Sequence, residues 1–341
     1  PPAPPPPRAA PAPPAAPLDS LFVSPGPLVE PGSLESSYWR LARALYATGF
    51  RQGQVIHNAF SYHATPGGWI FHAGARALGC PVIPAGTAPM ELQLQLLSAY
   101  RPVGFAGVPD FLAALVKAAQ EAGIPLPLER GLVSGGALTA AHLEGFAQAG
   151  LAVLQCYATA EVGLIAYETR SGQGLVVDEG VIVEIIDPQT DQPAAAGQVG
   201  EVVVTLLRRD YPLIRFATGD LSAVIPGPSP CGRTNLRLKG WLGRADQAAK
   251  VRGLFVRPSQ IHALVQRQGA VQRARLIISR PGERDEMALR CEVASQGADP
   301  SSLAEAIAAD LRALTQLRGE VVLMAPGELP DDGVLIEDTR R

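Results

Sequence analysis

The sequence Leu154-Gln155-Cys156-Tyr157-Ala158-Thr159-Ala160-Glu161-Val162-Gly163 begins at the end of an apolar run, residues 151–154. We interpret that run as a buried strand. The aromatic residue, small residues and carboxylate that follow pack poorly in a core but suit a ligand. A ring can stack on a base, small side chains admit a phosphate, and a carboxylate can hold a divalent cation. Taken alone, the stretch is explained equally well as an ordinary strand-to-loop junction.

The residues before this stretch alternate between strand and helix patterns. We predict strands at residues 21–23, 55–60, 81–83, 103–105, 131–133 and 151–154, and helices at 33–46, 67–78, 90–100, 109–122 and 140–149. Such alternation is typical of an α/β domain with a mostly parallel sheet. Ligands of such sheets bind beyond the carboxyl ends of the strands, where Ser134-Gly135-Gly136-Ala137 and the opening stretch both lie.

The pattern changes after Glu161. Residues 176–186 and 199–206 are β-rich and predict an antiparallel hairpin or small barrel, and strands and helices alternate again from residue 260. The predicted fold class is therefore α/β. It has a large N-terminal domain with a mostly parallel sheet and a small β-barrel-like part, followed by a small mobile α+β C-terminal domain. We place a Pro/Ala-rich leader at residues 1–19, the large domain at 20–242 with its β-rich part at 170–242, and the small domain at 243–341.

Composition and charge exclude several classes of partner. The formal net charge of −3 over 341 residues gives no electrostatic case for nucleic acid or an anionic membrane. No apolar run reaches membrane-spanning length, and no signal peptide begins the sequence. The four cysteines lack metal-ligand spacing, and Cys80 and Cys156 are expected to be buried thiols in a reducing compartment. We expect a cytoplasmic protein.

Four stretches in order carry a resemblance to a known family. They are Ser134-Gly135-Gly136-Ala137, Tyr157-Ala158-Thr159-Ala160-Glu161, Tyr211-Pro212-Leu213-Ile214-Arg215-Phe216-Ala217-Thr218-Gly219-Asp220, and Gly243-Arg244-Ala245-Asp246 with Lys250-Val251-Arg252-Gly253. Together they resemble the adenylate-forming enzymes, and most closely the phenylacetate–coenzyme A ligase branch. The likeness runs from about Leu21 to the end of the chain.

The resemblance implies an AMP-forming ligase for an acyl or aryl acid. Members activate a carboxylic acid with ATP and Mg²⁺ to an acyl-adenylate, and then transfer the acyl group to the thiol of coenzyme A. We expect the partners to be ATP, coenzyme A and a small, aromatic carboxylic acid, and a homodimer is possible by analogy.

The same resemblance assigns roles to residues of this chain. It implies that Tyr157 stacks on adenine, with Gly135, Gly136 and Ala137 shaping the slot for the base. Asp220 would accept hydrogen bonds from both ribose hydroxyls, and Arg244 would reach ribose or phosphate. The catalytic candidates are Glu161, which would also hold Mg²⁺, together with Lys250 and Arg244, and Asp246 would be the hinge. The complete nucleotide set is Ser134, Gly135, Gly136, Ala137, Tyr157, Ala158, Thr159, Asp220 and Arg244.

The acid pocket is predicted from a segment that follows the strand at 55–60. Phe60, Tyr62 and His63 could face an aryl acid, with Gly86 opposite them. A lone His after a strand is as readily explained as a structural residue.

The sequence departs from the family pattern in several places. By the resemblance the chain is N-terminally shortened, and only Ser24-Pro25-Gly26-Pro27 represents the phosphate loop. Ala160 replaces the hydroxyl residue that usually precedes the glutamate. Val334 stands where the family has a lysine that bridges acid and α-phosphate, and no Lys follows Lys250. Loss of that cation should slow adenylation.

Three functions therefore remain open. The leading hypothesis is the coenzyme A ligase. Val334 favours a catalytically impaired relative that binds nucleotide or acyl-CoA as a binding or regulatory module. The third is an aryl-acid adenylating enzyme with a carrier-protein thiol as the acceptor.

Overall fold

The computed structural model describes residues 19–24, 28–33, 35, 38–188, 190–208, 211–245, 247, 249–251, 254–281, 285–293 and 299–340. The predicted leader lies outside this part of the chain except for Asp19. The predicted hinge residue Asp246 and the Pro25-Gly26-Pro27 segment also lie outside it.

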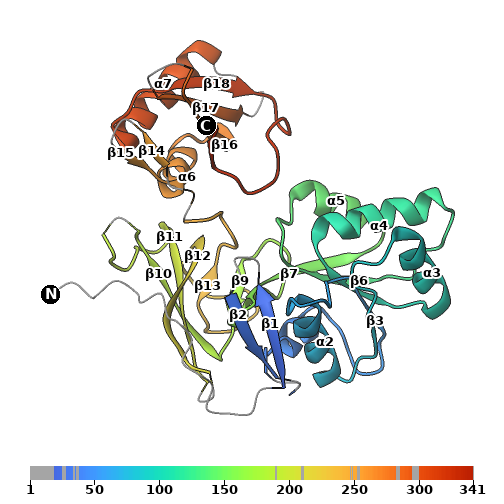
Figure 1. The fold of residues 1–341 in the computed structure, drawn as a ribbon. Helices are drawn as coiled ribbons and strands as arrows, with labels where there is room; N and C mark the ends of the chain where they lie inside the picture. The colour runs from blue at the N-terminus through green and yellow to red at the C-terminus, as the bar shows by residue number, and fades with distance from the viewer. Residues whose placement is uncertain are drawn as a thin grey trace.

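An eight-stranded sheet forms the centre of the larger body (Figure 1). Its strand order is β13-β9-β8-β7-β6-β5-β3-β4, and the strands from β4 to β7 run parallel. The strands are β3 (Ile56–Asn58), β4 (Val82–Ile83), β5 (Gly104–Gly107), β6 (Arg130–Val133), β7 (Ala152–Thr159), β8 (Gly163–Glu168), β9 (Leu175–Val177) and β13 (Arg237–Leu238). The last three join antiparallel and extend the sheet beyond the α/β part.

Helices cover both faces of the parallel part because successive strand residues point to opposite sides. Ala106 and Leu132 belong to the core beneath α1 (Ala42–Ala47) and α2 (Gly67–Ala77). Their neighbours Phe105 and Val133 belong to the core on the other face. That core packs under α3 (Met90–Tyr100), α4 (Pro109–Glu121) and α5 (Ala140–Gln148). The predicted α/β class with a mostly parallel sheet is confirmed.

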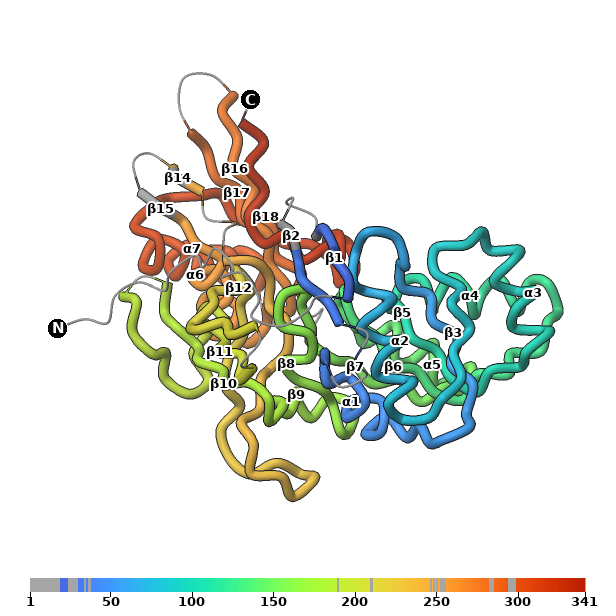
Figure 2. Tube along the Cα trace, turned by 60° about the horizontal axis from the view of Figure 1, so that its bottom comes forward, coloured from blue at the N-terminus to red at the C-terminus, as the bar shows by residue number. Residues whose placement is uncertain are grey.

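A smaller antiparallel sheet packs against the extension of the main sheet. It has the order β10-β11-β12, with β10 (Val181–Ile186), β11 (Val199–Leu206) and β12 (Leu213–Ala223). Residues of β8, β9 and β13 share one core with these strands. The connection from β12 to β13 projects away from this part (Figure 2). The β-rich region predicted after Glu161 is therefore present, and it carries Asp220 on β12.

The C-terminal residues form a separate core that lies above the larger body in Figure 1. A sheet of order β18-β17-β16-β19 contains β16 (Val271–Ser279), β17 (Glu286–Val293), β18 (Glu320–Met324) and β19 (Ile336–Asp338). Helices α6 (Pro258–Arg267) and α7 (Pro300–Thr315) pack on it, and β14 (Ala249–Val251) pairs with β15 (Leu254–Val256). A proline at the first turn suits both helices, and the Asp299 side chain caps α7. The domain boundary at residues 242 and 243 stays a prediction.

Near the N-terminal end the strand predicted at residues 21–23 is present, but the helix predicted from Ser33 needs correction. β1 (Ser20–Ser24) forms a hairpin with β2 (Leu28–Gly32), and no helix begins at Ser33. The Ser33 hydroxyl instead donates to Asp19 and accepts from the Glu35 amide. Arg40 has φ of 61°, a left-handed conformation that a helix cannot contain, so α1 begins only at Ala42. No helix in the described ranges is long and apolar enough to cross a membrane.

Candidate functional site

The loop after β6 is fixed to the neighbouring strand by one hydrogen bond. The buried Ser134 hydroxyl donates to the carbonyl of Cys156 on β7, at 2.8 Å. Gly135 has φ of 73°, and a Cβ on Gly136 would lie 3.3 Å from Pro109. A glycine relieves the strain of the first conformation and the crowding of the second. The pair therefore exposes backbone at the carboxyl end of the sheet.

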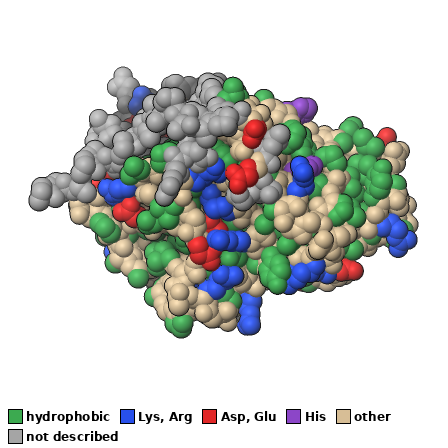
Figure 3. All heavy atoms as spheres, turned by 90° about the horizontal axis from the view of Figure 1, so that it is seen from below, with side chains coloured by type: hydrophobic (Ala, Val, Ile, Leu, Met, Phe, Trp, Pro, Cys, Tyr) green, Lys and Arg blue, Asp and Glu red, His purple; other side chains and the backbone are tan. Residues whose placement is uncertain are grey.

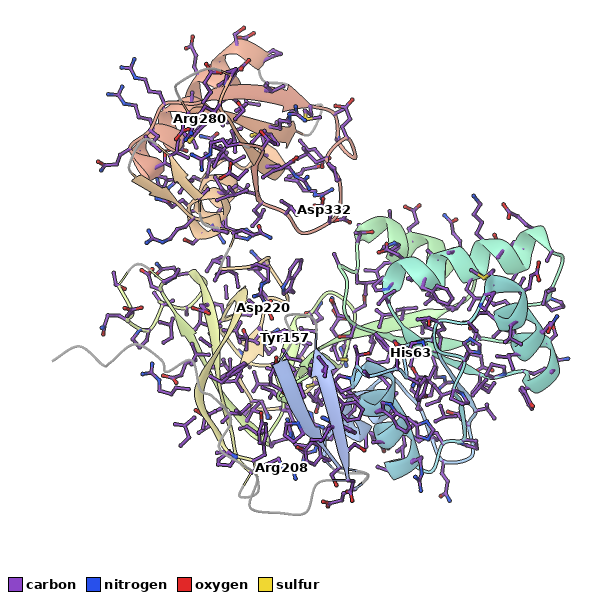
Figure 4. All side chains as sticks on the ribbon, in the orientation of Figure 1. His63, Tyr157, Arg208, Asp220, Arg280 and Asp332 are labelled. Atoms are coloured by element: carbon purple, nitrogen blue, oxygen red, sulfur yellow. The ribbon has the colours of Figure 1, made fainter. Side chains whose placement is uncertain are left out.

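β7 is longer than predicted and continues through the aromatic residue of the opening stretch. It pairs antiparallel with β8, and Tyr157 lies opposite Ala166. This pairing directs the Tyr157 hydroxyl to β12, where it donates to Oδ2 of Asp220 at 2.7 Å. Figure 4 shows Tyr157 and Asp220 close together, below the C-terminal part. Tyr157 of the main sheet and Asp220 of the smaller sheet are distant in sequence, and this hydrogen bond joins them.

Asp220 accepts hydrogen bonds from two further side chains. The residues after Gly240 run alongside β12, with backbone bonds from Leu221 to Gly243 and from Ala245 to Gly219. This arrangement lets Trp241 Nε1 donate to Asp220 Oδ1 at 3.0 Å and Arg244 Nη1 donate to the same oxygen at 3.2 Å. Gly219, at φ of 74°, leaves room for the guanidinium, because a Cβ there would lie 2.5 Å from Arg244 Nη2.

A pocket of about 260 Å³ opens between these groups. Its lining contains six of the predicted nucleotide residues, and it also contains four that sequence reasoning missed: Gln155, Cys156, Leu175 and Trp241. The predicted six are Ser134, Gly135, Gly136, Tyr157, Ala158 and Asp220. The missed Gln155 is held by the buried Glu168, which accepts from its backbone and side-chain nitrogens. Ala137 lines a different pocket.

The ionisation of Tyr157 follows from its surroundings. Burial, and then the negative charge of Asp220, raise the pKa of the Tyr157 hydroxyl well above its ordinary value. The phenol therefore stays protonated at neutral pH and remains a donor to Asp220. Its hydroxyl also lies 3.3 Å from Thr218 Oγ1, so the ring has a fixed orientation in the pocket wall.

The turn from β7 to β8 carries the predicted metal ligand. Thr159 Oγ1 accepts from the Val162 amide and closes the turn around Ala160 and Glu161. Thr159 therefore has a structural partner of its own and is not in the pocket lining. The half-buried Glu161 lies in this turn. Burial raises the pKa of the Tyr211 phenol, and Glu30, Tyr38 and Glu161 raise it further.

Arg40 holds this turn from outside. Its Nη2 donates to the carbonyls of Val162 at 2.9 Å and Leu164 at 2.7 Å, and its Nε donates to the fully buried Asp178 at 2.7 Å. Arg43 binds the other oxygen of Asp178 but contacts neither carbonyl, and its side chain is 49% exposed. Basic and acidic side chains gather on the face of the molecule seen from below (Figure 3). The two arginines thus share one carboxylate in different surroundings.

This difference gives a stability prediction. Arg40→Met should lower the free energy of unfolding by about 3–5 kcal/mol, because two carbonyls lose a charged donor and the buried Asp178 keeps only Arg43 and the Gly180 amide. Arg43→Met removes the ion pairs that a half-exposed side chain makes with Asp178 and Glu179, while Asp178 keeps Arg40, so it should cost about 0–1 kcal/mol. Urea unfolding of both variants measures the difference. Equal losses would show that Arg40 does not hold the turn.

Comparisons with known proteins agree with this geometry. The family described as AMP-binding enzyme matches residues 38–205, a range that contains the loop after β6 and Tyr157. Phenylacetate–coenzyme A ligase of Thermus thermophilus is 32% identical over 264 residues, which cover 74% of this chain and 59% of that protein. The chain belongs to the AMP-binding enzyme family. The resemblance to the phenylacetate–coenzyme A ligase branch is confirmed.

Further relatives extend the comparison. Phenylacetate–coenzyme A ligase of Aromatoleum evansii is 28% identical over 285 residues, covering 80% of this chain and 64% of that protein. The chain thus spans less than two thirds of the length of both relatives. A crystal structure of 2-hydroxyisobutyryl-CoA ligase in an open conformation, in complex with 2-HIB-AMP and CoA, superposes with a TM-score of 0.70. It is 24% identical, covers 92% of this chain and 73% of that one, and shows the shared fold.

In this AMP-binding family member, only some of the residues predicted for the acid pocket lie close together. Phe60 stacks on Phe71, and an added Cβ on Gly86 would lie 3.5 Å from Tyr62, so the predicted neighbours do approach one another. Sequence reasoning missed the groups around Tyr62, whose hydroxyl accepts from Asn58 and contacts His72 at 3.1 Å. His63 is exposed, and its backbone amide contacts Ser61. An aryl-acid site on these residues stays a prediction.

The remaining catalytic candidates belong to the C-terminal part. The backbone of Lys250 pairs with Phe255 in β14 and β15, and its side chain is outside the described structure. Val334 lines a second pocket of about 220 Å³, whose lining also contains Trp241, Gly243, Arg273 and Arg275. Trp241 lines both pockets. No group of three or more metal-binding side chains occurs among the described residues.

Proposed function

We propose that this protein is an AMP-forming ligase that activates a carboxylic acid with ATP and passes the acyl group to coenzyme A. One observation carries the proposal: a single pocket is lined by the Ser134-Gly135-Gly136 loop, Tyr157 and Asp220. The names of the relatives support it, since they are phenylacetate–coenzyme A ligases and a CoA ligase crystallised with an acyl-adenylate and CoA.

Each pocket group has a task in this proposal. The Tyr157 ring would stack on the adenine, while the exposed backbone of Gly135 and Gly136 lets the base approach. Asp220 would accept from the ribose hydroxyls, and Arg244 would supply a fixed positive charge beside ribose or phosphate. These residues bind and orient the nucleotide, so they accelerate adenylation by positioning the reacting groups.

Glu161 is the candidate ligand for Mg²⁺. A magnesium ion needs only one or two protein carboxylates when substrate phosphates and water complete its shell, so a single glutamate in the turn fits this ion better than a metal that requires three protein ligands. Bound there, the ion would neutralise phosphate charge. Arg40, by holding the carbonyl next to Glu161, would keep this carboxylate in place.

An exchange assay tests the proposal. Radioactive pyrophosphate should enter ATP only when a suitable acid is present, because acid and ATP give acyl-adenylate and pyrophosphate reversibly. We expect exchange with at least one member of a panel of aryl acids, phenylacetate among them, and formation of the corresponding thioester when coenzyme A is added. Absence of exchange across the panel, together with retained AMP binding in calorimetry, would contradict the ligase proposal.

A second candidate function is favoured by Val334, which provides no cation where the family has a lysine. In that case the pocket binds AMP or an acyl-CoA, and the protein acts as a binding or regulatory module. The same pair of assays distinguishes the two functions, because a module binds nucleotide without exchange.

The acceptor and the assembly need separate measurements. Coenzyme A and a phosphopantetheinylated carrier protein, compared at saturating acid, identify the thiol that takes the acyl group. We expect coenzyme A to react faster. Light scattering after size-exclusion chromatography tests the homodimer, and fractionation of cells tests the cytoplasmic location.

A further inference from the structure

Asp220 is almost saturated with hydrogen-bond donors. Tyr157 donates to Oδ2, and Trp241 and Arg244 both donate to Oδ1. An ionised carboxylate offers about four acceptor positions, and a ribose that binds through both hydroxyls takes two of them. Three present donors and two new ones exceed that capacity. At least one of the three must therefore leave when a ribose binds.

The three donors are not equally easy to displace. The Tyr157 phenol is buried and also contacts Thr218, at 3.3 Å. Arg244 carries the opposite charge to Asp220 and has a second bond from Nη1 to the Thr218 carbonyl at 3.1 Å. Trp241 is neutral and 38% exposed, and among the described contacts its Nε1 bonds only to Asp220.

We propose that Trp241 is a built-in competitor for the ribose of the nucleotide and thereby a specificity-determining residue of the pocket. The inference rests on the proposed nucleotide site. Its indole N–H occupies Asp220 until two vicinal hydroxyls replace it. A nucleotide without these hydroxyls donates no hydrogen bond to Asp220, so Trp241 keeps its place. The competition thus weakens ribonucleotide binding alone, and Trp241 lowers the preference of the pocket for ribonucleotides over nucleotides without the two hydroxyls.

The indole also contacts the C-terminal loop that carries Val334. Gly333 has φ of 70°, and a Cβ there would lie 2.0 Å from Cη2 of Trp241. The Gln247 side chain holds this part of the loop, donating to the Gly333 carbonyl and accepting from the Leu335 amide. Displacement of the indole by ribose must therefore disturb residues 333–335. Nucleotide binding and the position of this loop are coupled through one side chain.

Calorimetry with AMP and 2′,3′-dideoxy-AMP tests the competition. Trp241→Phe keeps an aromatic ring against Gly333 but removes the donor, so AMP should bind about threefold to tenfold more tightly than to the wild type. The affinity for the dideoxy nucleotide should be unchanged by the substitution. Equal or weaker AMP binding by the variant, with AMP binding intact in the wild type, would overturn the inference. Failure of the wild type to bind AMP would overturn the proposed function itself.

A second variant and a spectroscopic signal distinguish displacement of Trp241 from a merely structural effect of the substitution. Gly333→Ala places a methyl group against the indole and should also tighten AMP binding, because it pushes Trp241 from Asp220. AMP should change the tryptophan emission of the wild type, and this change should be absent in Trp241→Phe, which retains Trp39 and Trp69. An identical emission change in both proteins would show that Trp241 stays in place and would contradict the proposal.

Discussion

Asp220→Ala is expected to weaken AMP binding at least about 100-fold, because each hydrogen bond to a charged group contributes about 1.5–3 kcal/mol and two are lost with the ribose. The carboxylate is the group on which Tyr157, Trp241 and Arg244 converge, so its removal also loosens the pocket wall. Calorimetry with AMP measures the affinity. Asp220→Asn keeps the shape of the side chain and one acceptor oxygen, and this variant should bind AMP about tenfold more weakly than the wild type.

Glu184→Gln is the matched control for these substitutions. Glu184 lies on the same small sheet and pairs with Arg215 at 3.0 Å, but it does not line the pocket. The control should bind AMP as the wild type does. Thermal melting shows whether each variant is folded. A folded Asp220→Ala protein with wild-type affinity would remove Asp220 from the nucleotide site.

Val334→Lys is expected to raise the rate of acid-dependent pyrophosphate exchange on the order of tenfold or more. A cation that meets developing charge in a site shielded from water stabilises the transition state by several kcal/mol, and single donors of this kind are worth about 10²–10³ in rate. The substitution should not disturb folding, because Val334 is half-exposed in a loop. That loop is held through its backbone by Arg273, whose guanidinium binds the carbonyl of Pro330.

Val334→Met is the matched control, since it lengthens the side chain without adding charge. It should leave the exchange rate near that of the wild type. An unchanged rate in Val334→Lys as well would mean that the missing cation does not limit adenylation. Exchange that appears only in Val334→Lys would favour the binding-module function for the natural protein.

The α/β part was predictable from local pattern. Helix α3 covers Met90–Tyr100 as predicted, because Pro89 precedes it and its buried residues repeat with helical spacing. The start of α1 was not predictable in this way, because Arg40 has a left-handed conformation and its guanidinium binds the carbonyls of Val162 and Leu164, which lie far along the chain. β7 was predicted too short for the same kind of reason: its pairing with β8 extends it through Tyr157.

The candidate site, like the fold, was predictable from the sequence only in part. The order of motifs predicted that the loop at 134–136, Tyr157 and Asp220 act together, and one pocket contains them. Trp241 was missed because its contact to Asp220 depends on the path of the chain after Gly240 along β12, which no local pattern encodes.

A crystal structure of the protein with AMP tests the central claim most directly. We predict that the adenine lies against the Tyr157 ring beside the loop at residues 134–136, with both ribose hydroxyls within hydrogen-bond distance of Asp220 and the Trp241 indole displaced from it. AMP bound elsewhere, or in this pocket with its ribose away from Asp220, would contradict the account.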